Sequence, residues 1–498
     1  MLLNHFPEIN QFIELAERHN VIPVCAEILA DTETPVSLLK KFHDRESPVF
    51  LFESVEGGER WGRYSFIGTS ARTHIRIFSN DVEIKMNGSC EKIPHNGDPL
   101  AVLRTFMNRF KPAQINELPR FWGGLVGYMT YEMVSFFEKI PNRLPEGNPI
   151  AHFIIPDELI IFDNVRNTLL CVVVTFSEDG DDPGKRYNDA SHRIKGMLKR
   201  MEMAVSPRDE RTLDFHLSPL AVYDDEDYRQ KVIRTKEYIL AGDIIQSVIS
   251  QPFVCDAPTD LIELYRAKRY INPSPYLFFM DYGDTALVGS SPEVMVRLEN
   301  DIATLRPIAG TRARGKSEKE DRELADELLS DEKEKAEHLM LVDLGRNDLG
   351  RIAETGTVQV TDLMIVERYS HVMHLVSNIN CDIKPDKDAW DLIRATFPAG
   401  TLSGAPKVRA MEIIAELENE PRGPYGGAVG YVSFSGNMDL AITIRTAIVE
   451  KGKLTVRAGA GIVADSDPEK ERIETVNKAK AIEKALHLLK RKTINLEE

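Results

Sequence analysis

The segment Asp331–Gly350, DEKEKAEHLMLVDLGRNDLG, carries two carboxylates three residues apart, Glu334 and Glu337. In a helix both would project from one face, because side chains three or four positions apart are neighbours. An apolar run follows, so we expect this helix to pack against the body of the protein. Two carboxylates aimed into the protein could hold Mg²⁺, which prefers oxygen ligands. The alternative is a solvated helix start whose acids complement the helix dipole.

A second acid pair with the same spacing occurs near the end of the chain. Glu471 and Glu474 lie three residues apart in an expected helix, Pro468–Leu489, for which Asp467 is a suitable cap. Two helices, each with one acid pair, could hold a single Mg²⁺ between them. Acids at a helix start can also simply complement the dipole. That alternative explains Glu474 less well, because it lies further inside the helix.

Two features that could bind an anionic ligand, an arginine and a glycine-rich backbone, occur in segments close to the second acid pair. We expect Arg445 on a continuous strand, Asp439–Val449, where it would pair with an anion from a ligand or from the protein itself. Gly459, Ala460 and Gly461 form a glycine-lined strand end. They match part of a dinucleotide-binding fingerprint, but no βαβ unit follows them. Their backbone N–H groups could instead bind a carboxylate, and a tight turn is the alternative.

Three further segments contain residue types that are common in binding sites. Tyr425 precedes two glycines, whose bare backbones let a ligand approach closely. His374 lies in an apolar strand, where a structural histidine is more common than a catalytic one. The loop 397–407, rich in Gly, Pro, Ser and Thr, is typical of a turn cluster and equally of a ligand cradle.

The composition argues against several classes of protein. The chain has 498 residues and a net charge of −16, from 62 basic and 78 acidic residues, so nucleic acid is not the expected partner. Its five cysteines include no CxxC pair, which indicates neither a zinc site nor a disulfide framework. We expect no signal peptide, and no apolar run approaches the ~18 residues of a membrane span. A cytoplasmic protein without a membrane partner is predicted.

The order of the expected elements indicates an α+β fold, because strands come in runs with helices between the runs. A chain of this length exceeds one ordinary core. We place an N-terminal domain at 1–177, a connector at 178–224 and a second domain at 225–490. The helices are expected at residues 5–19, 37–43, 100–110, 185–203, 225–241, 390–395, 407–416 and 468–489.

Seven ordered motifs resemble the chorismate-utilising enzymes, and within them the component I branch of the anthranilate synthases. They are PIAGTRARG, DEKEKAEHLMLVDLGRNDLGR, HVMHLVS, FPAGTLSGAPKVRAM, PYGGAVGY, IRTAIVE and AGAGIVADSDPEKERIET. The resemblance is strong over 225–485 and weaker in the N-terminal half. It implies antiparallel sheets packed as a sandwich with flanking helices.

The resemblance also implies roles for individual residues. The metal ligands for Mg²⁺ would be Glu337 and Glu474, supported by Glu334 and Glu471. Glu293 would be the general acid, and His374 and Thr401 would act in the later loss of pyruvate. The substrate-binding residues would be Gly310, Thr311, Tyr425, Arg445, Gly459, Ala460 and Gly461.

The implied reaction converts chorismate and ammonia to anthranilate and pyruvate, the first step of tryptophan biosynthesis. Gln246 stands where water-using relatives carry lysine, and Ala309 stands where aminodeoxychorismate synthases usually carry lysine. None of the five cysteines has glycine on both sides, so a separate glutaminase subunit, component II, is implied as the ammonia source in a heterotetramer. The alternatives are an aminodeoxychorismate synthase component I and a tryptophan-binding regulatory protein with a dead site.

A regulatory site is implied by two further motifs, LFES and NPSPYLFF. They resemble the family's binding site for L-tryptophan as a feedback inhibitor, with Glu53, Ser54, Pro275, Tyr276 and Leu277 as its residues. Phe52 and Leu277 differ from the usual residues but keep an apolar wall. The alternative is that LFES is only a strand.

Overall fold

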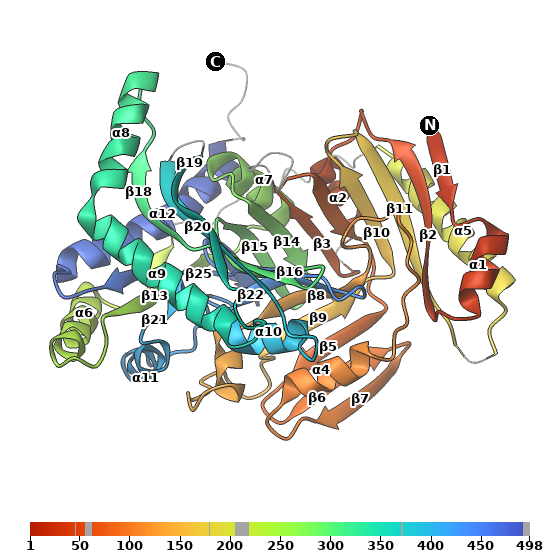
Figure 1. The fold of residues 1–498 in the computed structure, drawn as a ribbon. Helices are drawn as coiled ribbons and strands as arrows, with labels where there is room; N and C mark the ends of the chain where they lie inside the picture. Colours follow the sequence, from red (N-terminus) through yellow and green to blue (C-terminus); the bar gives the residue numbers. More distant parts are fainter. Residues whose placement is uncertain (45, 55–61, 179, 205–218, 370–371, 492–498) are drawn as a thin grey trace, which may run out of the picture.

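Two large antiparallel sheets pack face to face in the computed structural model, which describes residues 1–44, 46–54, 62–178, 180–204, 219–369 and 372–491 (Figure 1). Sheet 1 contains, in spatial order, β1 (Leu2–Phe6), β2 (Val21–Leu29), β11 (Thr168–Phe176), β10 (Glu158–Asp163), β4 (Tyr64–Gly68), β3 (Val49–Glu53), β14 (Tyr276–Asp281), β15 (Thr285–Ser291), β24 (Thr446–Glu450), β25 (Lys453–Ile462), β13 (Gln246–Asp256) and β12 (Leu220–Ala221), and β21 (Gly404–Ala405) pairs with β13.

Sheet 2 is built in the same way from strands of both halves of the chain. Its order is β18 (Ile308–Ala313), β20 (Val372–Asp382), β17 (Ile302–Leu305), β16 (Val294–Glu299), β23 (Met438–Ile442), β22 (Ala428–Ser433), β8 (Gly124–Met129), β9 (Ala151–Ile155), β5 (Thr73–Ile77), β6 (Asp81–Met86) and β7 (Ser89–Pro94), and β19 (Gln359–Arg368) pairs with β20. N-terminal and C-terminal strands meet at β3–β14 and β8–β22. The division at 1–177, 178–224 and 225–490 stays a prediction, and 205–218 lies outside the described residues.

Helices cover the outer faces of both sheets, and apolar side chains join each layer to the next. Sheet 1 carries α1 (Ile9–Ala16), α2 (Pro35–Phe42), α5 (Pro183–Met201), α6 (Asp225–Leu240), α7 (Leu261–Ile271), α11 (Lys407–Leu417) and α12 (Pro468–Arg491). Sheet 2 carries α4 (Pro99–Met107), α8 (Glu318–Ser330), α9 (Glu332–Gly350), α10 (Ala389–Thr396) and the 3-10 turns η1 (Tyr131–Phe136) and η2 (Gly400–Leu402). This arrangement confirms the predicted α+β sandwich with flanking helices.

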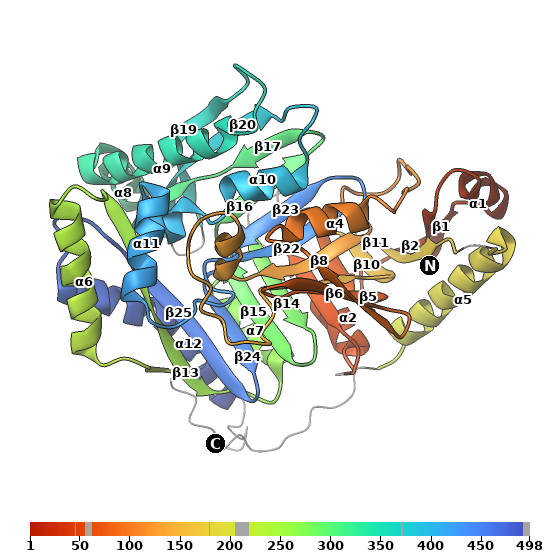
Figure 2. The ribbon, with the colours of Figure 1, turned by 90° about the horizontal axis from the view of Figure 1, so that it is seen from below.

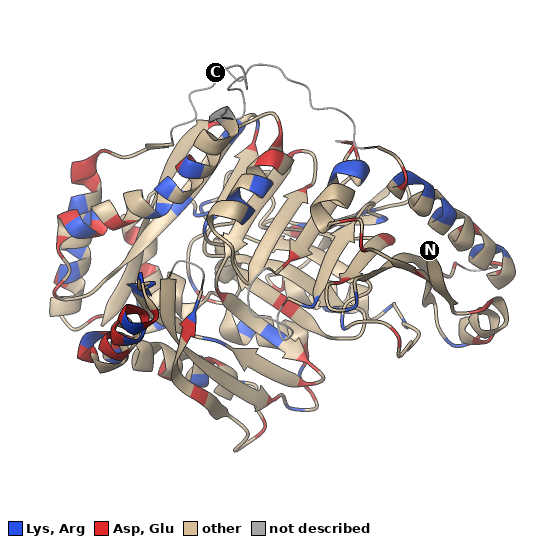
Figure 3. Cartoon of the chain, turned by 90° about the horizontal axis from the view of Figure 1, so that it is seen from above, with Lys and Arg blue, Asp and Glu red and all other residues tan. Residues whose placement is uncertain are grey.

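The layer between the sheets is rich in aromatic rings. Phe66 of sheet 1 packs at the edge of Phe121, and Phe121 stacks on Tyr431 of sheet 2 with 4.3 Å between ring centroids. Charged residues concentrate instead on the helices, whereas the strands carry few (Figure 3). None of the helices in the described ranges is long and apolar enough to cross a membrane.

Helices α6, α8, α9, α11 and α12 gather at the end of the sandwich that lies away from the N-terminus (Figures 1 and 2). Helices α9 and α12, which carry the two acid pairs, therefore belong to the same end of the molecule although they are remote from each other in the chain. As predicted, Asp467 caps α12, since its Oδ1 accepts from the backbone N–H groups of Glu469 and Lys470 at 3.0 and 2.9 Å.

Three expectations about elements are corrected. The helix expected at 5–19 starts only at Ile9, because Pro7 interrupts it and Phe6 belongs to β1. The continuous strand expected at Asp439–Val449 breaks into β23 and β24, because the chain crosses there from sheet 2 to sheet 1. Helix α7 was not anticipated, although Asp260 marks its start by accepting from the N–H of Glu263 at 3.1 Å.

A buried ion network ties β13, β25 and α11 together at this end of the sandwich. The Glu418 carboxylate accepts from Arg422 at 2.7 Å, from Arg457 at 2.9 Å and from the N–H of Ser250 at 2.7 Å. Glu418 is 3% exposed, and the two arginines with the Ser250 N–H lower its pKa to about 2 despite the burial. Removal of this carboxylate would leave two buried guanidinium groups without their counterion.

We therefore expect Glu418→Gln to lower the free energy of unfolding by about 3–5 kcal/mol at pH 7, measured by urea denaturation. Because the folded-state pKa is depressed, this stabilisation is present above the unfolded pKa and is lost as the pH falls towards 2. The matched control is Glu412→Gln, which breaks a surface pair with Arg409 and should cost less than about 1 kcal/mol. Equal stability of the Glu418→Gln variant and the wild type would contradict the assignment.

Candidate active site

A cavity of about 320 Å³, here called the central cavity, lies where β13 and β25 meet helices α9 and α12. Most of the residues predicted from the sequence line it, and they come from separate segments of the chain. They are Glu293, Thr311, Glu337, His374, Thr401, Tyr425, Arg445, Gly459, Gly461 and Glu474. A wider cavity of about 630 Å³, the mouth cavity, shares Thr311, His374, Arg445 and Glu474 with it and opens outwards.

Negative charge accumulates where α9 and α12 face this cavity. Burial raises the pKa of Glu337, and the charges of Glu334 and Glu474 raise it further, while Gln246 lowers it. Burial and Glu474 likewise raise the pKa of Glu471. Glu334 and Glu471 do not line the cavity and act on it through their charge. The two acid pairs therefore lie close enough for their charges to interact, and their role as metal ligands stays a prediction.

Lys478, one helical turn after Glu474, is a cavity residue that sequence reasoning missed. Its Nζ lies 2.8 Å from the Glu474 carboxylate and donates to the carbonyl oxygen of Gly459 at 2.7 Å. The i,i+4 spacing of these charges on α12 was a signal that could have identified it. Arg457 also lines the cavity and was missed.

Close contacts with two side chains explain why glycines occupy this end of β25. A Cβ atom at Gly459 would lie 2.7 Å from the Tyr425 hydroxyl oxygen, and one at Gly461 would lie 2.6 Å from Gln246 Nε2. Only glycine lets these side chains approach β25 so closely. Ala460 points the opposite way and packs among the apolar residues beneath α6. Its side chain is therefore separated from the cavity, although its backbone belongs to the same strand.

Arg445 occupies the break between β23 and β24 with a φ of +49°, a left-handed conformation that is uncommon for residues other than glycine. Its positive charge reaches the cavity, where it lowers the pKa values of Glu293 and His374. The sequence predicted Arg445 on a continuous strand, whereas the residue lies in the turn between β23 and β24, and its role in the site stays a prediction.

Glu293 is the acid in the cavity whose pKa is displaced furthest towards neutral pH. Burial raises its pKa to about 7, while the Thr401 hydroxyl and the charges of Arg445 and Lys478 lower it in part. A carboxyl group in this range can hold a proton near neutral pH and release it during a reaction.

His374 is held against β18. Its Nδ1 lies 2.9 Å from the carbonyl oxygen of Gly310 and 3.0 Å from the Thr311 hydroxyl, and its ring meets the edge of Tyr369. Burial lowers the pKa of His374, so the ring is neutral. Because a carbonyl only accepts, Nδ1 carries the hydrogen, which makes Nε2 the basic nitrogen of the ring. Gly310 in turn has a φ of +68°, and a Cβ there would lie 3.1 Å from the Glu334 carboxylate.

A second predicted site lies elsewhere, between β3, β14 and β22. Glu53, Ser54, Pro275, Tyr276 and Leu277 all border one cavity of about 50 Å³, here called the aromatic cavity. This is space for a few water molecules only. The Glu53 carboxylate points to α7, where it accepts from the hydroxyl of Tyr265 at 2.5 Å and from Arg269 at 2.7 Å.

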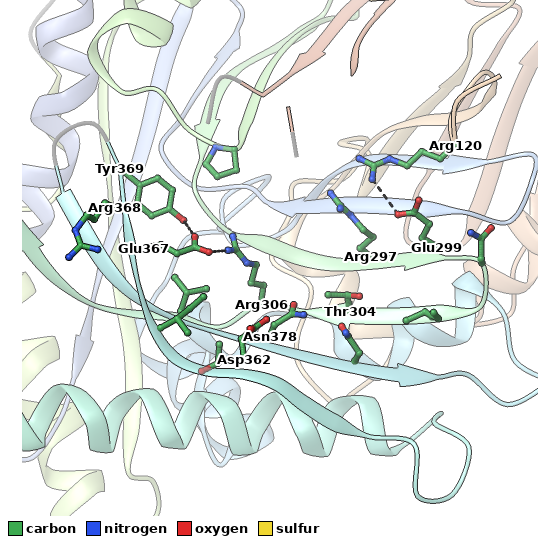
Figure 4. Close-up of a pocket in the computed structure, with 17 residues that line it drawn as sticks. Arg120, Arg297, Glu299, Thr304, Arg306, Asp362, Glu367, Arg368, Tyr369 and Asn378 are labelled. Atoms are coloured by element: carbon green, nitrogen blue, oxygen red, sulfur yellow. Dashed lines mark hydrogen bonds and ion pairs between the residues drawn. The ribbon is translucent and has the colours of Figure 1, made fainter. Parts of the chain in front are cut away.

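A larger cavity of about 820 Å³ adjoins the aromatic cavity and shares Pro275, Arg120 and Arg297 with it (Figure 4). Two ion pairs lie within its wall, Arg120 with Glu299 and Arg306 with Glu367. The Glu367 carboxylate also accepts from the Tyr369 hydroxyl at 2.9 Å. The wall therefore carries both arginines and acids.

Comparison with known proteins gives these cavities a family context. Residues 48–484 match the family described as chorismate binding enzyme. Anthranilate synthase component 1 of Aquifex aeolicus is 46% identical over 482 residues, which cover 95% of this chain and 96% of the relative. The protein of the same name from Pseudomonas putida is 48% identical over 492 residues, covering 96% of this chain and 98% of the relative.

Solved structures show the same architecture. Anthranilate synthase component I from Streptococcus pneumoniae superimposes with a TM-score of 0.72 and 38% identity, covering 85% of this chain and 92% of the other. The menaquinone-specific isochorismate synthase of Escherichia coli, 20% identical, superimposes with a TM-score of 0.70 over 96% of this chain and 98% of its own, which shows a shared fold. The chain belongs to the chorismate-binding enzymes, and within them to the anthranilate synthase component 1 family.

Proposed function

We propose that the chain is the aminating subunit of an anthranilate synthase and converts chorismate and ammonia to anthranilate and pyruvate in the cytoplasm. Ammonia would come from glutamine through a separate glutaminase subunit, component II. The observation that carries the proposal is the convergence of Glu337, Glu474, Glu293 and Arg445 on one cavity. The close relatives named anthranilate synthase component 1 support the assignment.

The acids of the cavity suit one Mg²⁺ ion. Burial, and then the charges of Glu334 and Glu474, raise the pKa of Glu337 and so disfavour its ionised form, and a divalent cation would offset both effects. Among the described residues, no group of three or more His, Cys, Asp or Glu gathers closely enough to hold a metal. Two glutamates completed by substrate oxygens and water match the usual binding of Mg²⁺. When bound, the ion would neutralise and orient the ring carboxylate of chorismate.

The second carboxylate of chorismate, on the enolpyruvyl group, faces the cationic side of the cavity in this proposal. Arg445 would bind it with charge-assisted hydrogen bonds, and the Tyr425 hydroxyl and the backbone N–H groups at Gly459 and Gly461 would donate to it. Thr311, with the neighbouring Gly310, would hold the ring against β18.

The first chemical step needs a proton donor and a nucleophile. Ammonia adds at C2 of chorismate, the ring double bonds shift, and the C4 hydroxyl leaves as water with a proton from Glu293, whose pKa of about 7 suits that role. Gln246 cannot act as a base towards water, which favours ammonia as the nucleophile.

The second step removes the C2 proton and expels pyruvate, which makes the ring aromatic. His374 would take that proton at Nε2, because Nδ1 is occupied by Gly310 and Thr311. The Thr401 hydroxyl, beside Glu293, would help to hold the enolpyruvyl group as it leaves. An aminodeoxychorismate synthase would instead place the amino group at C4, in the position of the lost hydroxyl, and would release no pyruvate.

A direct test is to incubate the purified chain with chorismate, Mg²⁺ and ammonium and to follow anthranilate fluorescence. Formation of anthranilate and pyruvate in equal amounts supports the proposal. Accumulation of aminodeoxychorismate would favour the alternative, and binding of L-tryptophan without any turnover would favour a regulatory protein. Glutamine should replace ammonium only when the glutaminase subunit is added.

We expect Glu337→Gln and Glu474→Gln each to reduce anthranilate formation by at least about 100-fold, because each removes a proposed Mg²⁺ ligand. The melting temperature should stay close to the wild-type value, since each change removes like-charge repulsion and the pair with Lys478 that Glu474→Gln breaks is half exposed. The matched control is Glu483→Gln on the same helix α12, which pairs with His487 and should keep full activity. Loss of folding in either of the first two variants would indicate a structural role instead.

The pH dependence should show Glu293 as the acid. At a constant concentration of free NH₃, kcat/KM for chorismate should fall above pH 7 with an apparent pKa of about 7, because only the protonated carboxyl can donate. Glu293→Gln should lower kcat by about 100-fold or more and abolish this falling limb. A falling limb that persists in the variant would refute the assignment.

We also propose that L-tryptophan inhibits the enzyme by binding at the aromatic cavity, with side chains moving towards the larger adjoining cavity to make room. Glu53 would accept from the tryptophan ammonium group. Glu53→Gln should weaken inhibition about tenfold without changing KM for chorismate, measured as the inhibitory concentration. Glu263→Gln, a similarly buried glutamate paired with Lys40 and Arg266, is the control that should leave inhibition unchanged.

A further inference from the structure

Lys268 on α7 is a buried lysine without an acidic partner. It is 3% exposed, and its Nζ donates to the backbone carbonyl oxygen of Arg445 at 2.7 Å. Within the described part of the chain, no carboxylate forms an ion pair with it. Burial and the charge of Arg445 lower the pKa of Lys268 to about 7. A buried ammonium beside a second cation is costly, so its presence needs a physical reason.

The carbonyl that Lys268 binds belongs to Arg445, a cavity residue whose backbone is left-handed. Arg445 has a φ of +49° at the point where the chain passes from sheet 2 to sheet 1. Hydrogen bonds close the turn around it, since the Ile444 N–H donates to Ile442 at 2.9 Å and the Thr446 hydroxyl donates to Ile444 at 2.8 Å. Lys268 holds the Arg445 carbonyl itself, from a different element of the fold.

We propose that Lys268 is a positioning residue: its hydrogen bond to the Arg445 carbonyl holds the turn between β23 and β24 so that the Arg445 guanidinium faces the central cavity and binds a carboxylate of the substrate. This inference rests on the proposed function for the identity of that substrate. It adds a residue from α7 to a site otherwise formed by strands, loops, α9 and α12.

The electrostatics support a role in anion binding over a role in stability. Two cations close together repel each other in the free protein, and an arriving carboxylate offsets that repulsion. Lys231 on α6 shows the contrast, because this similarly buried lysine has an acid, Asp227, at 2.8 Å. Replacing Lys268 with an apolar residue of similar shape should therefore leave the fold intact while it weakens substrate binding.

The test compares Lys268→Met with Lys231→Met in the full chain. The affinity for chorismate is measured calorimetrically with Mg²⁺ and without ammonia, and the kinetic constants with ammonium. We expect K268M to raise Kd and KM for chorismate about tenfold, with kcat and KM for ammonium within about twofold and no fall in Tm. K268Q keeps a donor and should recover most of the affinity, and K231M should bind chorismate as the wild type does.

A double-mutant cycle tests whether Lys268 acts through Arg445. In an R445A background, K268M should change Kd by less than about twofold, because the group that it positions is absent. An unchanged Kd in K268M, a full tenfold loss in the R445A background, or a K268M protein that fails to fold would each overturn the inference. Wild-type protein that binds no chorismate would instead overturn the proposed function.

Discussion

The central cavity depends on placing like charges close together and partly out of water. Glu337 and Glu474 face each other from helices that are remote in sequence, and Glu334 and Glu471 strengthen the negative field. Burial together with these charges disfavours the ionised forms of Glu337 and Glu471 unless a cation lies among the acids. In the protein alone, Lys478 supplies part of that charge through its 2.8 Å pair with Glu474. The cavity therefore suits a ligand that presents positive charge to the acids and negative charge to the cationic side chains.

The layers of the sandwich explain how Arg445 and the acids of α9 and α12 reach the cavity from different sides. β13 and β25 form one wall, and their alternation turns Gly459 and Gly461 inwards and Ala460 outwards. The chain supplies Arg445 where it crosses between the sheets, whereas Glu337 and Glu474 come from helices packed on the outside. The buried Glu418 network contains the cavity residue Arg457 and joins β13 to β25 beside the cavity.

Local patterns in the sequence predicted those features that depend on local physics. The three-residue spacing of the acids, the cap at Asp467 and the α+β order of elements all follow from neighbouring residues. The break at Arg445 could not be predicted in that way, because it arises where one strand must leave its sheet for another, which is a property of the whole fold. Pro7 was a local signal that was overlooked, since a proline there ends any helix that includes Phe6. The i,i+4 spacing from Glu474 was a local signal for Lys478, whereas Arg457 has no such signal, because the sequence alone does not show which face of β25 lines a cavity.

Helix α7, also absent from the sequence prediction, is the element that touches both predicted sites. Arg269 and Tyr265 hold Glu53 beside the aromatic cavity, and Lys268, the residue next to Arg269, holds the carbonyl of Arg445 beside the central cavity. Adjacent residues on a helix point in different directions, so one rigid helix contacts two walls at once. Helix α7 thus joins the walls of the two predicted sites through a few hydrogen bonds to charged groups and to one backbone carbonyl.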